Sequence, residues 1–256
     1  MTVDLVKRNG CALLTLNRLE ALNALSFDIL REIGEAFDEV ARWKDVRALL
    51  ITGAGDKAFC AGADIKELRN RTLSDQKRGS EFGQSVFSKL DSLPVASIAL
   101  VNGYAFGGGA ELALASTFRL AGTHAVFGLP EIKLGLIPGY GGTQRLPRLV
   151  GEGRALEIIM TGRSVKAEEA ERIGLVNMIT DGDMIEAGLE FAGRFTRYSL
   201  PALEFARRAV QRSGDGSLHD GLQLEADLST LAYQTRDAEE GMAAFEEKRK
   251  PEFNDD

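Results

Sequence analysis

The sequence has few cysteines and histidines, and this scarcity excludes several kinds of site. Its 256 residues include two cysteines, Cys11 and Cys60, and two histidines, His124 and His219. They cannot form a disulfide framework, and their spacing matches no structural zinc site. We therefore interpret the cysteines as small core residues in a reducing, cytosolic setting, give the histidines structural roles and expect no metal site.

Long apolar runs and an excess of basic charge are also missing. No apolar run approaches the ~18 residues of a membrane span, and residues 1–4 lack the pattern of a signal peptide. Lys and Arg together number 31 against 38 Asp and Glu, a formal net charge of −7. Because nucleic acids are bound through clusters of basic residues, we expect no nucleic-acid partner, no membrane partner and a cytoplasmic location.

The apolar pattern predicts an α/β fold with a mostly parallel sheet. Residues 3–7 and 12–16 flank Asn9-Gly10 as a hairpin, and Ser26 is the expected N-cap of a helix that begins at Phe27. Continuous apolar strands at 46–51 and 95–101 are separated by helices, as in parallel sheets. Shorter strands are expected at 117–121 and 175–179, and residues 69–79 as a mobile surface loop.

From Glu152 onward the patterns predict helices only, although a short strand is also expected at 175–179. We place a boundary near Pro201, which divides the chain into a core of residues 1–200 and a helical region of residues 201–256. Such a region has to cover the α/β core or contact another subunit. The expected helices are 154–160, 167–173, 184–195, 201–210, 218–233 and 238–248.

Three glycine-rich segments are candidates for chemistry. Gly107-Gly108-Gly109 lies between a buried strand and a helix, where free N–H groups favour negative charge; a tight turn without a ligand is the alternative. In the segment 59–65, small residues let a backbone N–H face a ligand, or Asp64 simply caps the helix that starts at Ile65. The third segment, 138–143, follows Glu131 closely. No phosphate-binding G-x-x-x-x-G-K-[ST] and no G-x-S-x-G nucleophile motif occurs.

Two glutamates leave two interpretations open. Glu131 follows Pro130 inside an otherwise apolar run, and is either a solvent-facing loop residue or a buried acid with a raised pKa. Glu111 either decorates the first turn of its helix or is buried in the same way.

Taken together, these segments resemble the enoyl-CoA hydratase/isomerase (crotonase) superfamily. The likeness runs in order from about Leu5 to Phe253, and its motifs are specific as a set. They are Leu16-Asn17-Arg18, Ala21-Leu22-Asn23-Ala24-Leu25, Ala61-Gly62-Ala63-Asp64-Ile65, residues 102–112, Pro130-Glu131-Ile132, Gly135-Leu136-Ile137-Pro138, Gly141-Gly142-Thr143-Gln144-Arg145-Leu146, and residues 240–251.

The resemblance implies a spiral of ββα units followed by a C-terminal helical trimerisation region. It also implies an acyl-CoA thioester substrate, a hexamer built as a dimer of trimers, and no cofactor beyond the CoA of the substrate. The backbone N–H groups of Ala61 and Gly108 match an oxyanion hole. Glu111 matches the residue that activates water, and Glu131 the residue that protonates Cα. The remaining substrate-binding matches are Gly62, Ala63, Asp64, Ile65, Pro130, Gly139 and, from a neighbouring subunit, Lys248.

Enoyl-CoA hydratase is the function that the resemblance favours, because both acids are present. The product would be a (3S)-3-hydroxyacyl-CoA. An enoyl-CoA isomerase or another acyl-CoA lyase of the same fold is the alternative, and an RNA-binding relative is a third. Cys60 and Tyr140 stand where smaller residues are more usual. The preferred acyl chain therefore stays open.

Overall fold

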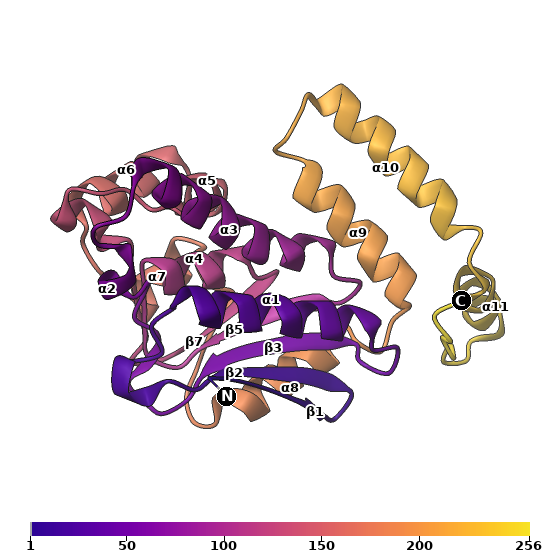
Figure 1. The fold of residues 1–256 in the computed structure, drawn as a ribbon. Helices are drawn as coiled ribbons and strands as arrows, with labels where there is room; N and C mark the ends of the chain where they lie inside the picture. The colour runs from indigo at the N-terminus through magenta and orange to yellow at the C-terminus, as the bar shows by residue number, and fades with distance from the viewer. Residues whose placement is uncertain (1) are drawn as a thin grey trace.

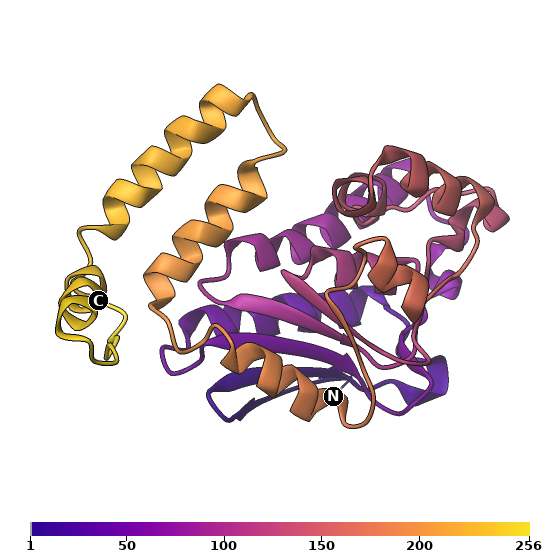
Figure 2. The ribbon, with the colours of Figure 1, turned by 180° about the vertical axis from the view of Figure 1, so that it is seen from behind.

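The computed structural model describes residues 2–256 and is built on two β-sheets (Figures 1 and 2). In the larger sheet, every neighbouring pair is parallel except the hairpin between the first two strands, which confirms the predicted hairpin and mostly parallel sheet. In spatial order its strands are β1 (Val3–Arg8), β2 (Cys11–Leu16), β3 (Ala48–Gly53), β5 (Ala96–Val101), β7 (Phe118–Gly122) and β10 (Met178–Thr180).

The smaller sheet explains why the chain forms a spiral. Its strands in order are β4 (Ala58–Cys60), β6 (Tyr104–Phe106), β8 (Val126–Gly128) and β9 (Val165–Lys166). Three times in succession, the chain adds a strand to the larger sheet, then one to the smaller sheet, and then a helical segment. The expected spiral of ββα units is thereby confirmed. The strands of the smaller sheet were not predicted, because segments of two or three residues show no periodic pattern. One of them, β9, lies in the part of the chain after Glu152 for which only helices were expected, so that expectation is wrong there.

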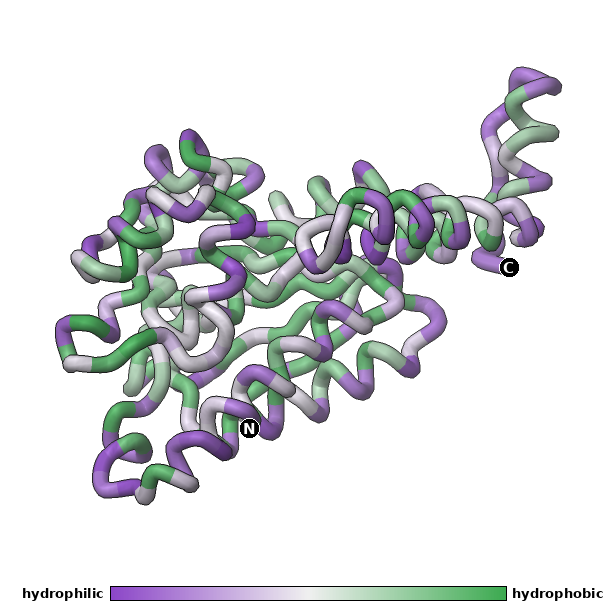
Figure 3. Tube along the Cα trace, turned by 90° about the horizontal axis from the view of Figure 1, so that it is seen from above, coloured by the Kyte–Doolittle hydropathy of each residue, from purple (hydrophilic) through white to green (hydrophobic). Residues whose placement is uncertain are grey.

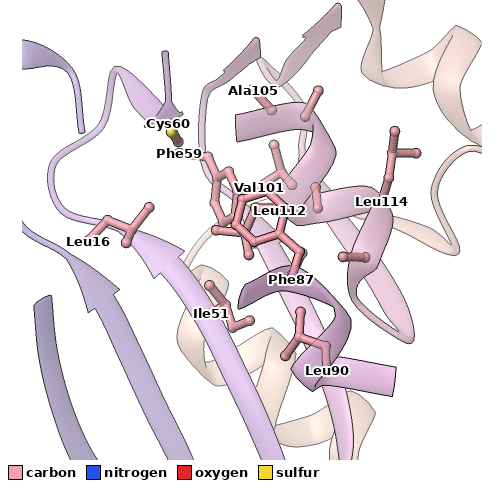
Figure 4. Close-up of a cluster of buried hydrophobic side chains, with 14 of the residues drawn as sticks. Leu16, Ile51, Phe59, Cys60, Phe87, Leu90, Val101, Ala105, Leu112 and Leu114 are labelled. Atoms are coloured by element: carbon pink, nitrogen blue, oxygen red, sulfur yellow. The ribbon is translucent and has the colours of Figure 1, made fainter. Parts of the chain in front are cut away.

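Helices surround the larger sheet and bury most of its apolar surface (Figure 1). Figure 4 shows one part of this core, where Phe59, Phe87 and Leu112 meet. Ser26 accepts a hydrogen bond from the Ile29 N–H, as expected of an N-cap. The helices of the body are η1 (Leu19–Ala21), α1 (Phe27–Arg42), α2 (Ile65–Leu68), α3 (Leu73–Ser92), α4 (Gly108–Ala115), η2 (Pro130–Leu134), α5 (Gly142–Val150), α6 (Glu152–Thr161), α7 (Ala167–Arg172) and α8 (Met184–Gly193).

The expected mobile loop over residues 69–79 is wrong. Helix α3 begins at Leu73, and the Thr72 hydroxyl caps it by accepting the Asp75 N–H at 3.1 Å. The error arose because the buried face of this helix begins with glycines in place of large apolar residues. Gly79 and Gly83 lie one turn apart on the buried face, so no apolar period marks the helix there.

The two cysteines are core residues, as predicted. Cys11 and Cys60 are both buried and unpaired with one another. Burial raises the pKa of the Cys60 thiol to about 12, so the group stays protonated and unreactive at neutral pH.

Three helices project from the body as a C-terminal arm, which we define as residues 200–256 (Figures 1 and 2). Arg207 anchors the arm by donating hydrogen bonds to the backbone carbonyls of Leu90 and Leu93. Apolar positions continue along the projecting helices (Figure 3). Within residues 2–256, none of the helices has the length and apolar character needed to cross a membrane. The arm consists of α9 (Leu200–Arg212), α10 (Leu218–Ala232), α11 (Arg236–Glu247) and the terminal segment.

Candidate active site

Glu111 lies in the first turn of α4, and its side chain is buried. Its Oε1 accepts hydrogen bonds from the backbone N–H groups of Tyr140 at 2.7 Å and Gly142 at 2.8 Å. Burial raises the pKa of Glu111 to about 7, and the charge of nearby Glu131 acts in the same direction. Of the two interpretations that the sequence left open, a buried acid is confirmed for this residue.

Glu131 enters the same region from η2, directly after Pro130. Its Oε2 is buried, and among residues 2–256 no hydrogen-bond donor reaches it. Burial raises the pKa of this carboxyl group as well. A buried carboxyl oxygen without a partner is costly in a folded protein, and such groups concentrate at functional sites. Glu131 is therefore not a solvent-facing loop residue: the residue is partly buried, and its Oε2 is shielded from solvent.

Two glycines allow the backbone to close around these acids. Gly107 has a φ of 49°, which favours glycine, and a Cβ added to it would lie 2.9 Å from Oε1 of Glu131. Gly62 has a φ of 111°, and its Cβ position would lie 3.0 Å from the Phe106 carbonyl oxygen and 3.8 Å from Cα of Gly107. The segments around Gly62 and Gly107 therefore lie side by side next to Glu131.

The structure places the free backbone N–H groups differently from the expectation. Gly108 is the first residue of α4, and among the described residues its N–H has no acceptor, as expected at a helix start. The N–H of Ala61, however, donates to the Leu22 carbonyl at 3.0 Å. Ala61 is consequently wrong as a donor to a substrate, because its N–H is already used within the protein.

Ala63 has the free amide that Ala61 lacks. It forms a parallel bridge with Leu25, in which the Leu25 N–H donates to the Gly62 carbonyl and the Asp64 N–H donates to the Leu25 carbonyl. In a parallel bridge of this kind, the N–H of Ala63 itself points away from Leu25. Nowhere in residues 2–256 does it find an acceptor. Ala63 was predicted only as a general substrate contact. Its bridge with Leu25 leaves its N–H free, whereas the N–H of Ala61 is already bonded.

The other predicted site residues fall into three places. Asp64 caps α2 by accepting the Lys66 N–H at 3.1 Å, and an ion pair with Arg18 at 2.9 Å lowers the pKa of its carboxyl group. Ile65 follows it and is half exposed. Pro130 adjoins Glu131, and the Gly139 carbonyl accepts a hydrogen bond from Gln84 of α3. Lys248 is the C-cap of α11 on the arm, and α9 lies between α11 and α4 (Figures 1 and 2).

A large cavity in the described part of the chain lies elsewhere. It has a volume of about 1410 Å³ between α9 and the body, and neither Glu111 nor Glu131 lines it. Throughout residues 2–256, no three His, Cys, Asp or Glu side chains gather as they would around a metal ion.

The arrangement has the parts needed for proton transfer next to a developing negative charge. Two neighbouring carboxyl groups whose pKa values are raised suit one group as base and the other as acid. The free N–H groups of Ala63 and Gly108 come from adjacent backbone segments and can stabilise an oxyanion. This chemistry suits a substrate with a carbonyl group beside the carbon that is protonated.

Comparisons with known proteins agree along the whole chain. Residues 6–256 match the model of the family described as Enoyl-CoA hydratase/isomerase. The chain is 41% identical to the crotonyl-CoA hydratase of Syntrophomonas wolfei over 98% of this chain and 97% of that protein. It is 39% identical to the short-chain-enoyl-CoA hydratase of Clostridium acetobutylicum over 98% of this chain and 96% of that protein.

A solved structure shows the same architecture. The enoyl-CoA hydratase of Bacillus anthracis superposes with a TM-score of 0.95 at 36% identity, covering 100% of both chains. Because both the family model and the relatives span nearly the full length, the chain belongs to the enoyl-CoA hydratase/isomerase family.

Proposed function

We propose that this protein is an enoyl-CoA hydratase, which adds water reversibly to a trans-2-enoyl-CoA and forms a (3S)-3-hydroxyacyl-CoA. The observation that carries this proposal is a pair of acids on one site: Glu111 is buried, and Glu131 is partly buried with a buried Oε2 that no donor reaches among residues 2–256. Hydration removes one proton from water and delivers one to Cα, so it uses two groups. Relatives named as hydratases at about 40% identity support the same reaction.

The thioester carbonyl would accept hydrogen bonds from the N–H groups of Ala63 and Gly108. These two donors stabilise the negative oxygen that forms when hydroxide adds to C3. The positive end of α4 points at the same oxygen through Gly108. In this scheme, CoA arrives as part of the substrate, and the protein's own groups carry every proton transfer without a separate cofactor.

The two acids have different surroundings, which assigns their roles. Glu111 receives two backbone N–H bonds, and such bonds favour the carboxylate form. Its Oε1 is occupied by them, so Oε2 is the oxygen that would take the proton from water. Glu131 lacks a donor to Oε2, which favours the neutral acid and its transfer of a proton to Cα. In the active enzyme, the carboxyl groups of Glu111 and Glu131 share one proton.

The remaining predicted contacts are proposed to hold the CoA thioester. Gly62 and Gly139 provide space beside the acyl group, and Pro130 sets the direction in which Glu131 enters. Asp64 and Ile65 begin α2 at the rim of the site.

A chain-length assay tests the proposal directly. Trans-2-enoyl-CoA thioesters of increasing length should lose their enoyl-thioester absorbance when the protein is added, with 3-hydroxyacyl-CoA as the product. An isomerase would convert a 3-enoyl-CoA into the 2-enoyl isomer instead. Absence of hydration at every chain length, with isomerisation intact, would replace the hydratase assignment by the isomerase one.

We also propose that the protein works as a hexamer, a dimer of trimers. The C-terminal arm exposes large apolar side chains in numbers unusual for a monomer surface. In the proposed assembly, Lys248 approaches a CoA phosphate bound by a neighbouring subunit. The exposed residues are Val210, Leu218, Leu222, Leu231, Tyr233, Met242 and Phe245.

Light scattering should therefore give the mass of six chains for the full-length protein. Truncation after Gly216 removes α10 and α11 and should reduce both solubility and activity, because the body loses its partner surfaces. A stable, fully active monomer of the complete chain would contradict this assembly.

A further inference from the structure

Helix α3 carries two glycines on its buried face, and each one faces an aromatic ring. A Cβ added to Gly83 would lie 2.3 and 2.5 Å from Cδ1 and Cε1 of Tyr140. A Cβ added to Gly79 would lie 2.9 and 3.1 Å from Cζ and Cε1 of Phe27. Glycine inside a helix is less favourable than alanine. At positions 79 and 83, glycine therefore lowers helix stability but leaves room for an aromatic ring.

The opposite side of the Tyr140 ring lies against the proposed oxyanion donor. The Cβ position of Gly108 is 3.2 Å from Cδ2 and 3.3 Å from Cε2 of this ring. Phe87 packs against its edge with the ring centroids 5.8 Å apart at 88°. The backbone N–H of Tyr140 holds Glu111. The ring is therefore fixed on all these sides, between α3 and the first turn of α4.

This position limits the room for an acyl group. If the thioester oxygen lies at the Gly108 N–H and C3 lies within reach of Glu111, the carbons beyond C3 run toward the Tyr140 ring, which adjoins both groups. The ring is almost completely buried, and Tyr140 is also one of the residues that line the cavity between α9 and the body, which neither Glu111 nor Glu131 lines. Burial, aided by the charge of Glu111, raises the pKa of its hydroxyl to about 12, so the side chain is neutral at neutral pH.

We propose that Tyr140, accommodated by Gly83, closes the acyl end of the site and restricts this protein to short, unbranched 2-enoyl-CoA substrates. The inference rests on the proposed hydratase function and deepens it by naming the residue that sets chain length. Tyr140 touches the reacting groups through its N–H, whereas its side chain acts on specificity alone.

Replacing Tyr140 by alanine tests this role while keeping the backbone N–H that holds Glu111. For the wild-type protein, kcat/KM should be highest with C4 or C6 trans-2-enoyl-CoA and should fall steeply by C10. In Tyr140→Ala, the ratio of kcat/KM for C10 to that for C4 should rise by roughly tenfold or more, because pocket contacts with single carbon groups change rates by such factors. Tyr140→Phe should keep the wild-type ratio, since it keeps the ring.

Phe27 provides a matched control. Its ring is accommodated by Gly79, one turn before Gly83 on α3, whereas the three atoms nearest to the Cβ position of Gly108 belong to Leu25 and Tyr140. Phe27→Ala should therefore leave the C10-to-C4 ratio unchanged, although it removes a ring of similar size. An unchanged ratio in Tyr140→Ala, with measurable C4 hydration, would overturn the assignment; so would an equal rise in Phe27→Ala. If the wild-type protein hydrates no enoyl-CoA, the proposed function fails instead.

A pair of glycine variants keeps the test decisive if the cavity left by Tyr140→Ala impairs folding. In Gly83→Ala, the new methyl group collides with the ring, so thermal stability and C4 hydration should both fall. Adding Tyr140→Ala removes the colliding ring, so the double variant should regain stability and show the raised C10-to-C4 ratio. A double variant that is less stable than Gly83→Ala, or that hydrates with the wild-type ratio, would contradict the proposal.

Discussion

Replacing Glu111 or Glu131 by glutamine should lower the rate of hydration by ~10²–10⁴ in each case, since a general acid or base contributes that much. Glutamine keeps the size of glutamate and an oxygen that accepts hydrogen bonds, but it cannot exchange a proton. In Glu111→Gln, the side-chain oxygen can still accept the N–H groups of Tyr140 and Gly142. Binding of the CoA ester, measured by calorimetry, should change little.

The double variant shows whether the two acids act as a unit. If they serve one water molecule and one Cα, losing the second acid adds little to the loss of the first, and the double variant should resemble the slower single variant. An isomerase that uses one acid would show one nearly silent substitution and one severe one. Full hydration by either single variant would remove that glutamate from the mechanism.

The pH dependence provides a second readout of the same variants. Glu111 has a pKa near 7, and it must be ionised to accept a proton from water, so kcat/KM should fall as the pH drops below about 7. At high pH, the pair loses its shared proton and activity should fall again. Because Glu111→Gln has no carboxyl group at this position, its residual activity should lack the acidic limb.

The pH dependence of thermal stability provides a control that the Glu111→Gln variant is folded. The pKa of Glu111 is raised from 4.5 to about 7, so between these values the folded state binds more protons than the unfolded state. The free energy of unfolding therefore decreases as the pH rises through this interval. In Glu111→Gln this contribution disappears, and Tm should vary less between pH 5 and 8 than in the wild type. An inactive variant with this flatter profile is folded, and its loss of activity is chemical.

The sequence predicted the larger sheet well because its strands are long, apolar and separated by helices. β2, β3 and β5 lie close to the expected positions. The smaller sheet was not predicted, because each of its strands has only two or three residues. These strands pair with strands from other turns of the spiral, which are far away in the sequence. The start of α3 was missed for a related reason. Its buried face is defined by the rings of Phe27 and Tyr140, which come from other parts of the chain.

The candidate site was predictable as a set of residues but not as an arrangement. Whether Glu111 is buried depends on N–H groups that lie 29 and 31 residues later in the chain, so local pattern left the question open. The choice between Ala61 and Ala63 as a donor depends on where the Leu22 and Leu25 backbone groups pair. The resemblance located the right segment, and only the backbone hydrogen bonds separate the two residues.

The last prediction concerns the second backbone donor, Gly108. Gly108→Pro should lower the rate of hydration by ~10²–10³, because it removes one N–H from the proposed oxyanion hole. Proline is compatible with the first position of a helix. The preceding Gly107, at φ 49° and ψ −124°, lies outside the right-handed helical region that a following proline disfavours.

Gly108→Ala is the matched control for this substitution. Both variants place a Cβ 3.2 Å from Leu25 Cδ1 and from the Tyr140 ring, so both require these neighbours to shift by a few tenths of an ångström. Alanine keeps the N–H, however, and proline does not. The loss should thus be small in Gly108→Ala and should appear mainly in kcat, since the oxyanion forms after the substrate is bound. If a folded Gly108→Pro protein turned over as fast as Gly108→Ala, the contacts of the ring would account for the defect, and Gly108 would have no role as a donor.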